Sequence, residues 1–86
     1  MLHIIRARHL QDFTLWLDFD DGTSGEVDLR GQLQGPIFQP LLDPAFFAQV
    51  ALDPELETVV WPNGADLAPE FLSELQKGQL AQKVKK

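Results

Sequence analysis

The chain holds few side chains suited to binding a metal ion. It contains two histidines, His3 and His9, and no cysteine. In one predicted strand, six residues of about 3.3 Å each place the histidines roughly 20 Å apart, too far to share an ion. The acidic residues in and around the predicted hairpin also lack the spacing of a calcium-binding loop. They are Asp18, Asp20, Asp21 and Asp28. We therefore predict no metal site and no bound cofactor.

Catalytic groups are equally hard to find. The two serines are Ser24, in a predicted hairpin arm, and Ser73, on a predicted surface helix. Neither sits in a strained turn or beside an obvious histidine base, as an activated nucleophile would. No glycine-rich loop joins a strand to a helix, so a phosphate cradle is not indicated. We predict no catalytic residues and expect that the protein is not an enzyme.

The segment Trp61–Asp66, with the sequence WPNGAD, has two interpretations. In the first it is a rigid corner, where Pro62 ends a strand, Asn63-Gly64 makes a tight turn and Trp61 closes the core. In the second it is a surface notch, where Trp61, Asn63 and Asp66 face a ligand or partner protein. The first is favoured because turn residues often resemble a site.

A second candidate for interaction is Trp16. In the alternating run Phe13–Phe19, FTLWLDF, it lies on the face opposite Leu15 and Leu17. It therefore either packs under a helix or marks an exposed interaction patch.

Charge limits the class of partner. The formal net charge of −6 divides into about −10 for residues 1–76 and about +4 for residues 77–86. An acidic body repels phosphate backbones, so we expect no nucleic acid and favour a cationic protein partner. The chain has no long apolar run for a membrane span or signal peptide. Together with the absence of cysteine, this predicts a cytoplasmic location.

The alternating run predicts a strand over residues 13–19 with one buried face. A two-residue turn after it would put Glu26 and Asp28 opposite buried leucines. A three-residue loop, Asp20-Asp21-Gly22, instead pairs Leu17 with Gly25 and Leu15 with Val27, and gives glycine the left-handed position. We therefore predict the three-residue loop.

The remaining elements complete an α+β fold, an antiparallel sheet of about five strands with two short helices. Strands are predicted at 3–9, 49–52 and 57–61, with a turn near Gln11-Asp12 and a largely irregular segment at 30–42. Asp43 caps a short helix that starts at Pro44. A last helix is predicted from about Pro69 to Lys77, ended by Gly78. Residues 1–78 thus form one domain, followed by a basic C-terminal tail, 79–86.

The order of these motifs resembles the bacterial DUF2442 family over roughly residues 3–75. The resemblance rests on Leu15–Leu29 with its L-x-L-x-F-x-D-G core, Phe38, Asp43-Pro44 followed by phenylalanine, and above all TVVWPNGADLAPE, Thr58–Glu70. It implies the fold of an N-terminal domain first seen in a protein of a nitrifying bacterium. It implies no established activity and no catalytic residues.

The resemblance also suggests partners. Proteins of this family are often encoded beside a small protein of the DUF4160 family, in an arrangement like a toxin–antitoxin pair. Some relatives carry a helix-turn-helix domain after this one; we expect none here, and therefore no direct operator binding. Others bear a name from molybdopterin-guanine dinucleotide biosynthesis, which would need a phosphate-binding loop.

The leading hypothesis is a non-catalytic protein-interaction module, in its narrower form an antitoxin-like partner of a small cationic protein. The alternative is a small-ligand sensor that uses the Trp61–Asp66 corner. An enzyme or an accessory of cofactor biosynthesis ranks third. Homodimerisation through an unpaired sheet edge is compatible with each.

Overall fold

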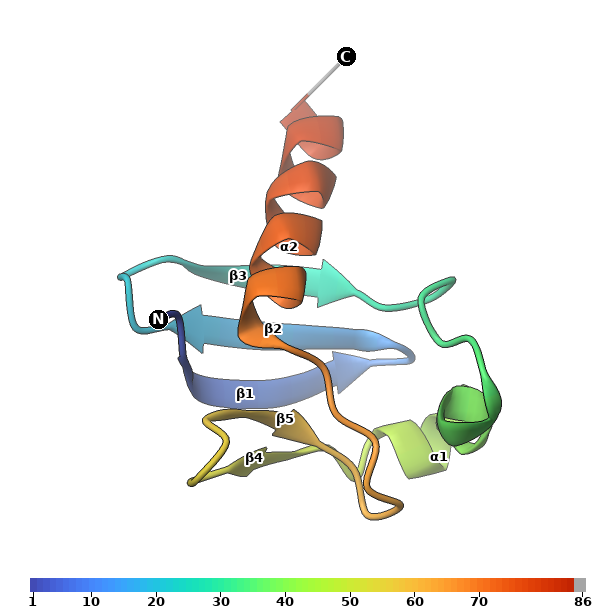
Figure 1. Cartoon of the computed structure of the whole chain (residues 1–86). Helices are drawn as coiled ribbons and strands as arrows, with labels where there is room; N and C mark the ends of the chain where they lie inside the picture. The colour runs from blue at the N-terminus through green and yellow to red at the C-terminus, as the bar shows by residue number, and fades with distance from the viewer. Residues whose placement is uncertain (85–86) are drawn as a thin grey trace.

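The computed structural model describes residues 1–84 and has the predicted α+β class (Figure 1). Its elements are β1 (Ile4–Gln11), β2 (Thr14–Phe19), β3 (Ser24–Asp28), the 3₁₀ helix η1 (Pro36–Leu42), α1 (Pro44–Phe47), β4 (Ala51–Asp53), β5 (Thr58–Val60) and α2 (Pro69–Val84). The five strands divide between two antiparallel sheets, β1-β2-β3 and β4-β5. Within the described residues, no helix combines the length and the apolar composition needed to cross a bilayer.

The β2–β3 hairpin has the predicted register. Leu17 pairs with Gly25 and Leu15 with Val27. The backbone N–H of Phe19 donates to the carbonyl oxygen of Thr23 at 2.8 Å and closes the three-residue loop. In that loop Gly22 has φ 91°, a conformation open to glycine without steric cost. The opposed-residue argument from the sequence is thus confirmed.

The first strand extends two residues further than predicted. β1 ends at Gln11, and the turn to β2 is made by Asp12 and Phe13, one residue later than expected. Asp12 adopts φ 43° in this turn. Aspartate tolerates that left-handed conformation better than most residues, which explains the shift.

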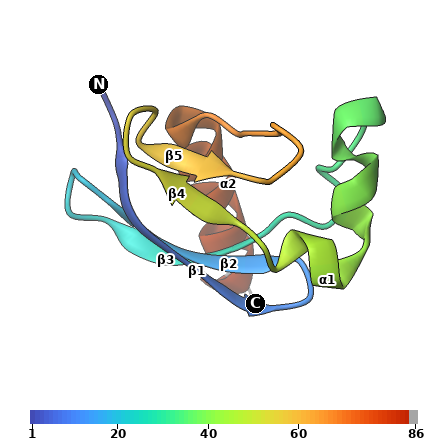
Figure 2. The same ribbon diagram turned by 90° about the horizontal axis from the view of Figure 1, so that it is seen from below.

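The two sheets form layers around the core. In Figure 2, β4-β5 and the η1–α1 segment lie on one side of the three-stranded sheet, and of the described elements only α2, at the β3 edge, borders its other face. We call these the inner and outer faces. The backbone N–H of Ile4 donates to the carbonyl oxygen of Glu57 at 2.9 Å, which ties the start of β1 to the β4–β5 turn.

The core fills the inner face. Leu15, Leu17 and Phe19 are buried, and Phe13 packs against them while partly exposed. Other elements add Leu41, Phe47, Val59, Trp61 and Leu72. Burying each such side chain contributes roughly 1.5–3 kcal/mol, so this face accounts for much of the stability.

The short helix in the middle of the chain also agrees with its prediction from the sequence. The Asp43 carboxylate accepts from the backbone N–H of Ala45 at 3.1 Å, as expected of the N-cap, with Pro44 at the first helical position. Phe47 is buried, and Phe46 and Val50 pack against the core. Residues 30–42 contain more regular structure than expected, because η1 buries Leu41.

The predicted end of the last helix is wrong. α2 continues through Gly78 to Val84, so residues 79–84 of the predicted tail are helical; Lys85 and Lys86 lie outside the described residues. Gly78 does not have the positive φ of a helix-ending glycine. Gln79, in the next turn, bonds to β3 and holds the helix there.

Candidate functional site

The Trp61–Asp66 corner is part of the core. The Trp61 side chain is buried, with 3% of the residue exposed, and its indole N–H donates to the carbonyl oxygen of Phe47 at 2.9 Å. The ring also packs on that of Phe47, with centroids 5.5 Å apart. The hypothesis that Trp61 presents its ring at the surface is therefore wrong. A buried indole needs a partner for its N–H, and here the partner lies inside the protein.

The polar residues of the corner have structural contacts too. The Asn63 side chain donates to the carbonyl oxygen of Ile37 at 2.8 Å and accepts from the backbone N–H of Ala65 at 3.2 Å. Asp66 is exposed and its backbone bridges to Val60. The corner thus joins β5, η1 and the approach to α2. The three predicted residues do not converge on one ligand position.

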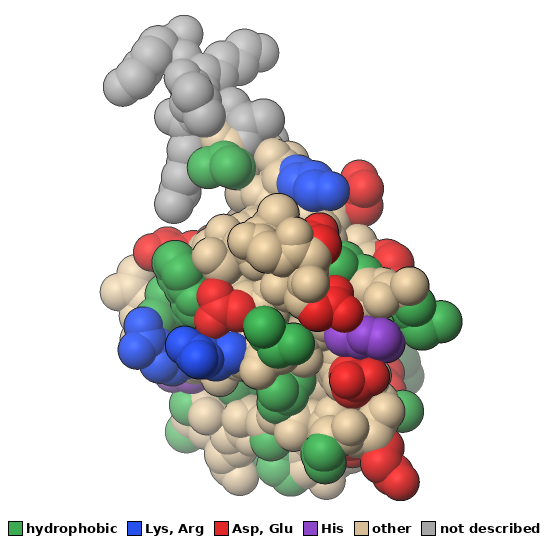
Figure 3. All heavy atoms as spheres, turned by 90° about the vertical axis from the view of Figure 1, so that its left-hand side faces the viewer, with side chains coloured by type: hydrophobic (Ala, Val, Ile, Leu, Met, Phe, Trp, Pro, Cys, Tyr) green, Lys and Arg blue, Asp and Glu red, His purple; other side chains and the backbone are tan. Residues whose placement is uncertain are grey.

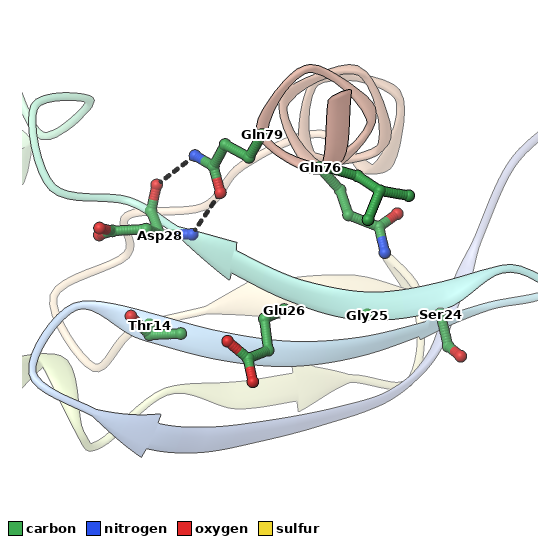
Figure 4. Close-up of a pocket in the computed structure, with 8 residues that line it drawn as sticks. Thr14, Ser24, Gly25, Glu26, Asp28, Gln76 and Gln79 are labelled. Atoms are coloured by element: carbon green, nitrogen blue, oxygen red, sulfur yellow. Dashed lines mark hydrogen bonds between the residues drawn. The ribbon is translucent and has the colours of Figure 1, made fainter. Parts of the chain in front are cut away.

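A groove lies on the other side of the molecule, between α2 and the outer face. It has a volume of about 350 Å³, near the lower end of the usual range for small-molecule sites. Its lining comes from both sheet and helix: Thr14, Ser24, Gly25, Glu26, Asp28, Gln76, Gln79 and Leu80. Figure 4 shows Thr14 and Glu26 on the sheet, with Gln76 and Gln79 reaching down from α2. We call this the α2–β3 groove.

Gln79 attaches the helix to the edge of the sheet. Its side-chain Oε1 accepts from the backbone N–H of Asp28 at 2.8 Å, and its Nε2 donates to the carbonyl oxygen of the same residue at 2.7 Å. A neighbouring strand would use these same backbone groups. α2 therefore protects this end of the β3 edge from pairing with another strand.

Gln76 makes the second contact between α2 and β3. It is largely buried, and its amide lies over Gly25, where a larger residue would have a side chain. Sequence analysis singled out neither glutamine. The spacing of three residues puts them on one face of a helix, but nothing local indicates that β3 lies opposite.

Trp16 lies beside the groove, at the centre of the outer face. Its direct neighbours across the sheet are Arg8 on β1 and Glu26 on β3. Its indole N–H donates to the Asp18 carboxylate at 3.2 Å, and the Arg6 guanidinium lies 3.7 Å from that carboxylate. The ring is half-buried by these neighbours. Of the two predicted tryptophans, Trp16 is the partly exposed one, whereas Trp61 is buried.

The outer face carries charge of opposite sign at its two margins. Arg6 and Arg8 project from β1, and Glu26 and Asp28 from β3. All four residues are exposed. A protein that docks on this face thus meets a basic column on one side of Trp16 and an acidic column on the other.

A second cluster joins three loops at one end of the molecule. The His3 imidazole places Nδ1 2.9 Å from the Asp20 carboxylate and Nε2 3.2 Å from that of Glu57. The His3 backbone N–H also donates to Asp20 at 3.0 Å. That bond is the main reason why the pKa of Asp20 lies below its ordinary value, and the imidazole lowers the pKa further. Figure 3 views this end and shows a histidine among acidic side chains.

The His3 cluster is best explained as a structural contact between loops. Its three side chains are partly exposed, and no group of three or more histidine, cysteine or acidic residues within the described part of the chain could hold a metal ion. On the same turn, the hydroxyl and backbone N–H of Thr23 lower the pKa of Asp21. Hydrogen-bonded surface carboxylates commonly behave in this way.

Comparison with known proteins places the chain in a family. The model of DUF2442, described as a protein of unknown function, matches residues 4–78. The chain belongs to the DUF2442 family. None of the curated proteins compared with it matches.

A solved structure supports the fold. The crystal structure of "Putative DNA Binding Protein NE0471" from Nitrosomonas europaea superposes with a TM-score of 0.81 and 23% sequence identity. The match covers 94% of this chain and 52% of that protein, so this DUF2442 chain spans about half the length of its structural relative. At this identity the similarity shows the fold alone.

Proposed function

We propose that this DUF2442 protein is a non-catalytic protein-interaction module that docks its partner on the outer face. The observation that carries the proposal is the position of Trp16. It is a large aromatic side chain at the centre of an uncovered sheet face, beside a groove of about 350 Å³. Tryptophan at the centre of a docking surface commonly supplies a large share of the binding energy.

The charge of the protein favours a cationic partner. The chain has 13 acidic residues against seven lysines and arginines, and two of the acidic residues, Glu26 and Asp28, line the groove. A lysine or arginine of the partner could lay its aliphatic stem along Trp16 or Leu80 and its charged end near these carboxylates. In its narrower form the partner is a small DUF4160-type protein, and the chain acts as its antitoxin-like counterpart in the cytoplasm.

Nucleic-acid binding has less support. The Nitrosomonas europaea protein is named for DNA binding as a whole, and about half of it lies outside the match. The described side chains of residues 1–80 have a formal charge of about −9, which opposes contact with phosphates. Basic residues on the outer face are Arg6 and Arg8, next to carboxylates.

A ligand sensor and an enzyme also have less support. The corner proposed for a sensor uses Trp61 and Asn63 in internal hydrogen bonds. An active site would be expected where strongly perturbed carboxylates lie in a cleft. Among the described residues, the two carboxyl groups with a lowered pKa are those of Asp20 and Asp21, and they lie instead on the β2–β3 turn.

Co-expression with the product of the adjacent reading frame tests the proposal. We expect the two proteins to elute together in size-exclusion chromatography at low salt and less completely at high salt. Trp16→Ala and Glu26→Lys should each weaken the complex at least tenfold, whereas Asp66→Lys, an equal charge change on the other side, should not. Separate elution of the wild-type proteins at low salt would count against the proposal.

A further inference from the structure

The outer face is complementary to itself. Register places Arg8, Trp16 and Glu26 in one row across the three strands, with the aromatic residue between the two charges. Arg6, Asp18 and Ser24 form the next row. A second copy turned over onto this face can therefore set its basic column against the acidic column of the first.

We propose that a second copy of this chain docks on the outer face about a two-fold axis parallel to β2. That rotation puts β1 of each copy over β3 of the other and keeps Trp16 in the middle. Arg8 of each copy then faces Glu26 of the other, and the two Trp16 rings meet. A two-fold axis at right angles to the strands would set β1 on β1 and bring arginines together, so charge selects the first arrangement.

The distances involved suit these side chains. Sheets packed face to face lie about 10 Å apart, a gap that an arginine and a glutamate can bridge from opposite sides. Glu26 also makes a contact within its own chain. A carboxylate has room for more than one donor, so an added guanidinium does not require that contact to break.

The edge of β3 is a poorer place for self-association. The backbone groups of Asp28 there are already bonded to Gln79, and α2 crosses this edge (Figure 1). Two β3 edges would also bring Glu26 and Asp28 of both copies together, with like charges opposed. Docking through the outer face, in contrast, leaves α2 in place over the β3 edge and brings opposite charges together.

The area of the face limits the strength of the dimer. Three short strands about 4.8 Å apart give a flat area on the order of 300 Å², below the ~800 Å² per partner of a stable complex. The rim of α2, with the exposed Leu80, adds to it. We therefore expect a dissociation constant on the order of 100 µM, which corresponds to a dimer that forms and separates readily.

Self-association and the proposed cationic partner use the same carboxylates, so each excludes the other. The dimer does not require that partner to exist. It is tested on the purified chain alone, whereas the proposed function is tested by co-expression. Failure of one experiment therefore leaves the other informative.

The experiment is sedimentation equilibrium of the purified chain from about 10 µM to 1 mM, where mass action should convert monomer to dimer. In a dimer of the Arg8→Glu variant, two glutamates face each other at each contact between positions 8 and 26. In a dimer of the Glu26→Arg variant, two arginines face each other there. Each variant alone should dimerise at least tenfold more weakly than the wild type. An equimolar mixture of the two should recover dimerisation to within about threefold, because every contact then joins opposite charges.

Asp66→Arg is the matched control for Glu26→Arg, since it makes the same charge change at an exposed position away from the outer face. It should dimerise as the wild type does. Circular dichroism verifies that each variant is folded. A wild type that stays monomeric up to 1 mM, or a mixture of folded variants that dimerises no better than either alone, would overturn the proposal.

Discussion

The side-chain amide of Gln76 occupies the space where a Cβ atom on Gly25 would stand. This contact lets α2 approach β3 closely enough for Gln79 to reach the backbone of Asp28. Gly25→Ala should therefore lower the free energy of unfolding by about 1–3 kcal/mol, the usual range for overpacking a close contact. Urea unfolding followed by circular dichroism measures the change.

The double variant Gly25→Ala/Gln76→Ala is the control for that prediction. It removes the amide that the new methyl group would contact. Its loss of unfolding free energy should therefore be smaller than the sum of the losses measured for the two single variants. Part of the loss should remain, because Gly25 has φ 156°, which alanine adopts less readily. Strictly additive effects would show that the contact does not limit the approach of α2.

Gly78 gives a second prediction, of opposite sign. It lies inside α2, and nothing stands within 4 Å of the position of an added Cβ atom. Gly78→Ala should raise the free energy of unfolding by about 0.5–1 kcal/mol, because alanine loses less backbone entropy in a helix. The midpoint of thermal unfolding should rise accordingly.

Gly64→Ala is the contrasting variant. Gly64 has φ 90° in the turn of the corner, where alanine is strained, so the midpoint of unfolding should fall. If Gly78→Ala lowered the midpoint as well, the helical conformation at Gly78 would be in doubt.

The wrong prediction at Gly78 shows which features of the fold a local sequence pattern cannot predict. A glycine that follows an apolar stripe and a lysine, here Lys77, is a common pattern at the end of a helix. The pattern is local, however, and the helix is held by Gln79, whose partner Asp28 lies 51 residues away. The α2–β3 groove depends on that distant contact, so it could not be predicted either.

The β2–β3 hairpin is the opposite case, because each step of the argument was local. The alternation of apolar and polar residues determined which face of the strand is buried. The cost of burying carboxylates then excluded the two-residue turn. The Asp43 cap was predictable for the same reason. Alternation also placed Trp16 on the face opposite the core, as observed, but the basic column beside it required the pairing of β1 with β2.

The two tryptophans should differ in their effect on stability. Trp61→Phe leaves the Phe47 carbonyl oxygen without its buried donor, which should lower the free energy of unfolding by about 1–3 kcal/mol. Trp16→Phe removes a half-buried ring on the outer face and should cost less than about 1 kcal/mol. Chemical denaturation of both variants measures the difference. A larger loss for Trp16→Phe than for Trp61→Phe would contradict the core position of Trp61.

The Asp20 carboxylate predicts a pH dependence of stability. Its pKa is lowered in the folded protein, mainly by the backbone N–H of His3 and further by the imidazole. Its contribution is thus present above the unfolded pKa of about 3.9 and is lost as the pH falls through the lower folded value.

Asp20→Asn, compared with the wild type in urea unfolding between pH 6 and pH 2.5, isolates this contribution. The wild type should be the more stable protein at pH 6, and the difference should shrink below about pH 4, because protonation of Asp20 removes the favoured charge. Asp66→Asn, which removes a charge at another exposed position, controls for net charge. A difference between wild type and Asp20→Asn that stays constant over the whole range would mean that the carboxylate charge does not hold the N-terminus to the β2–β3 turn.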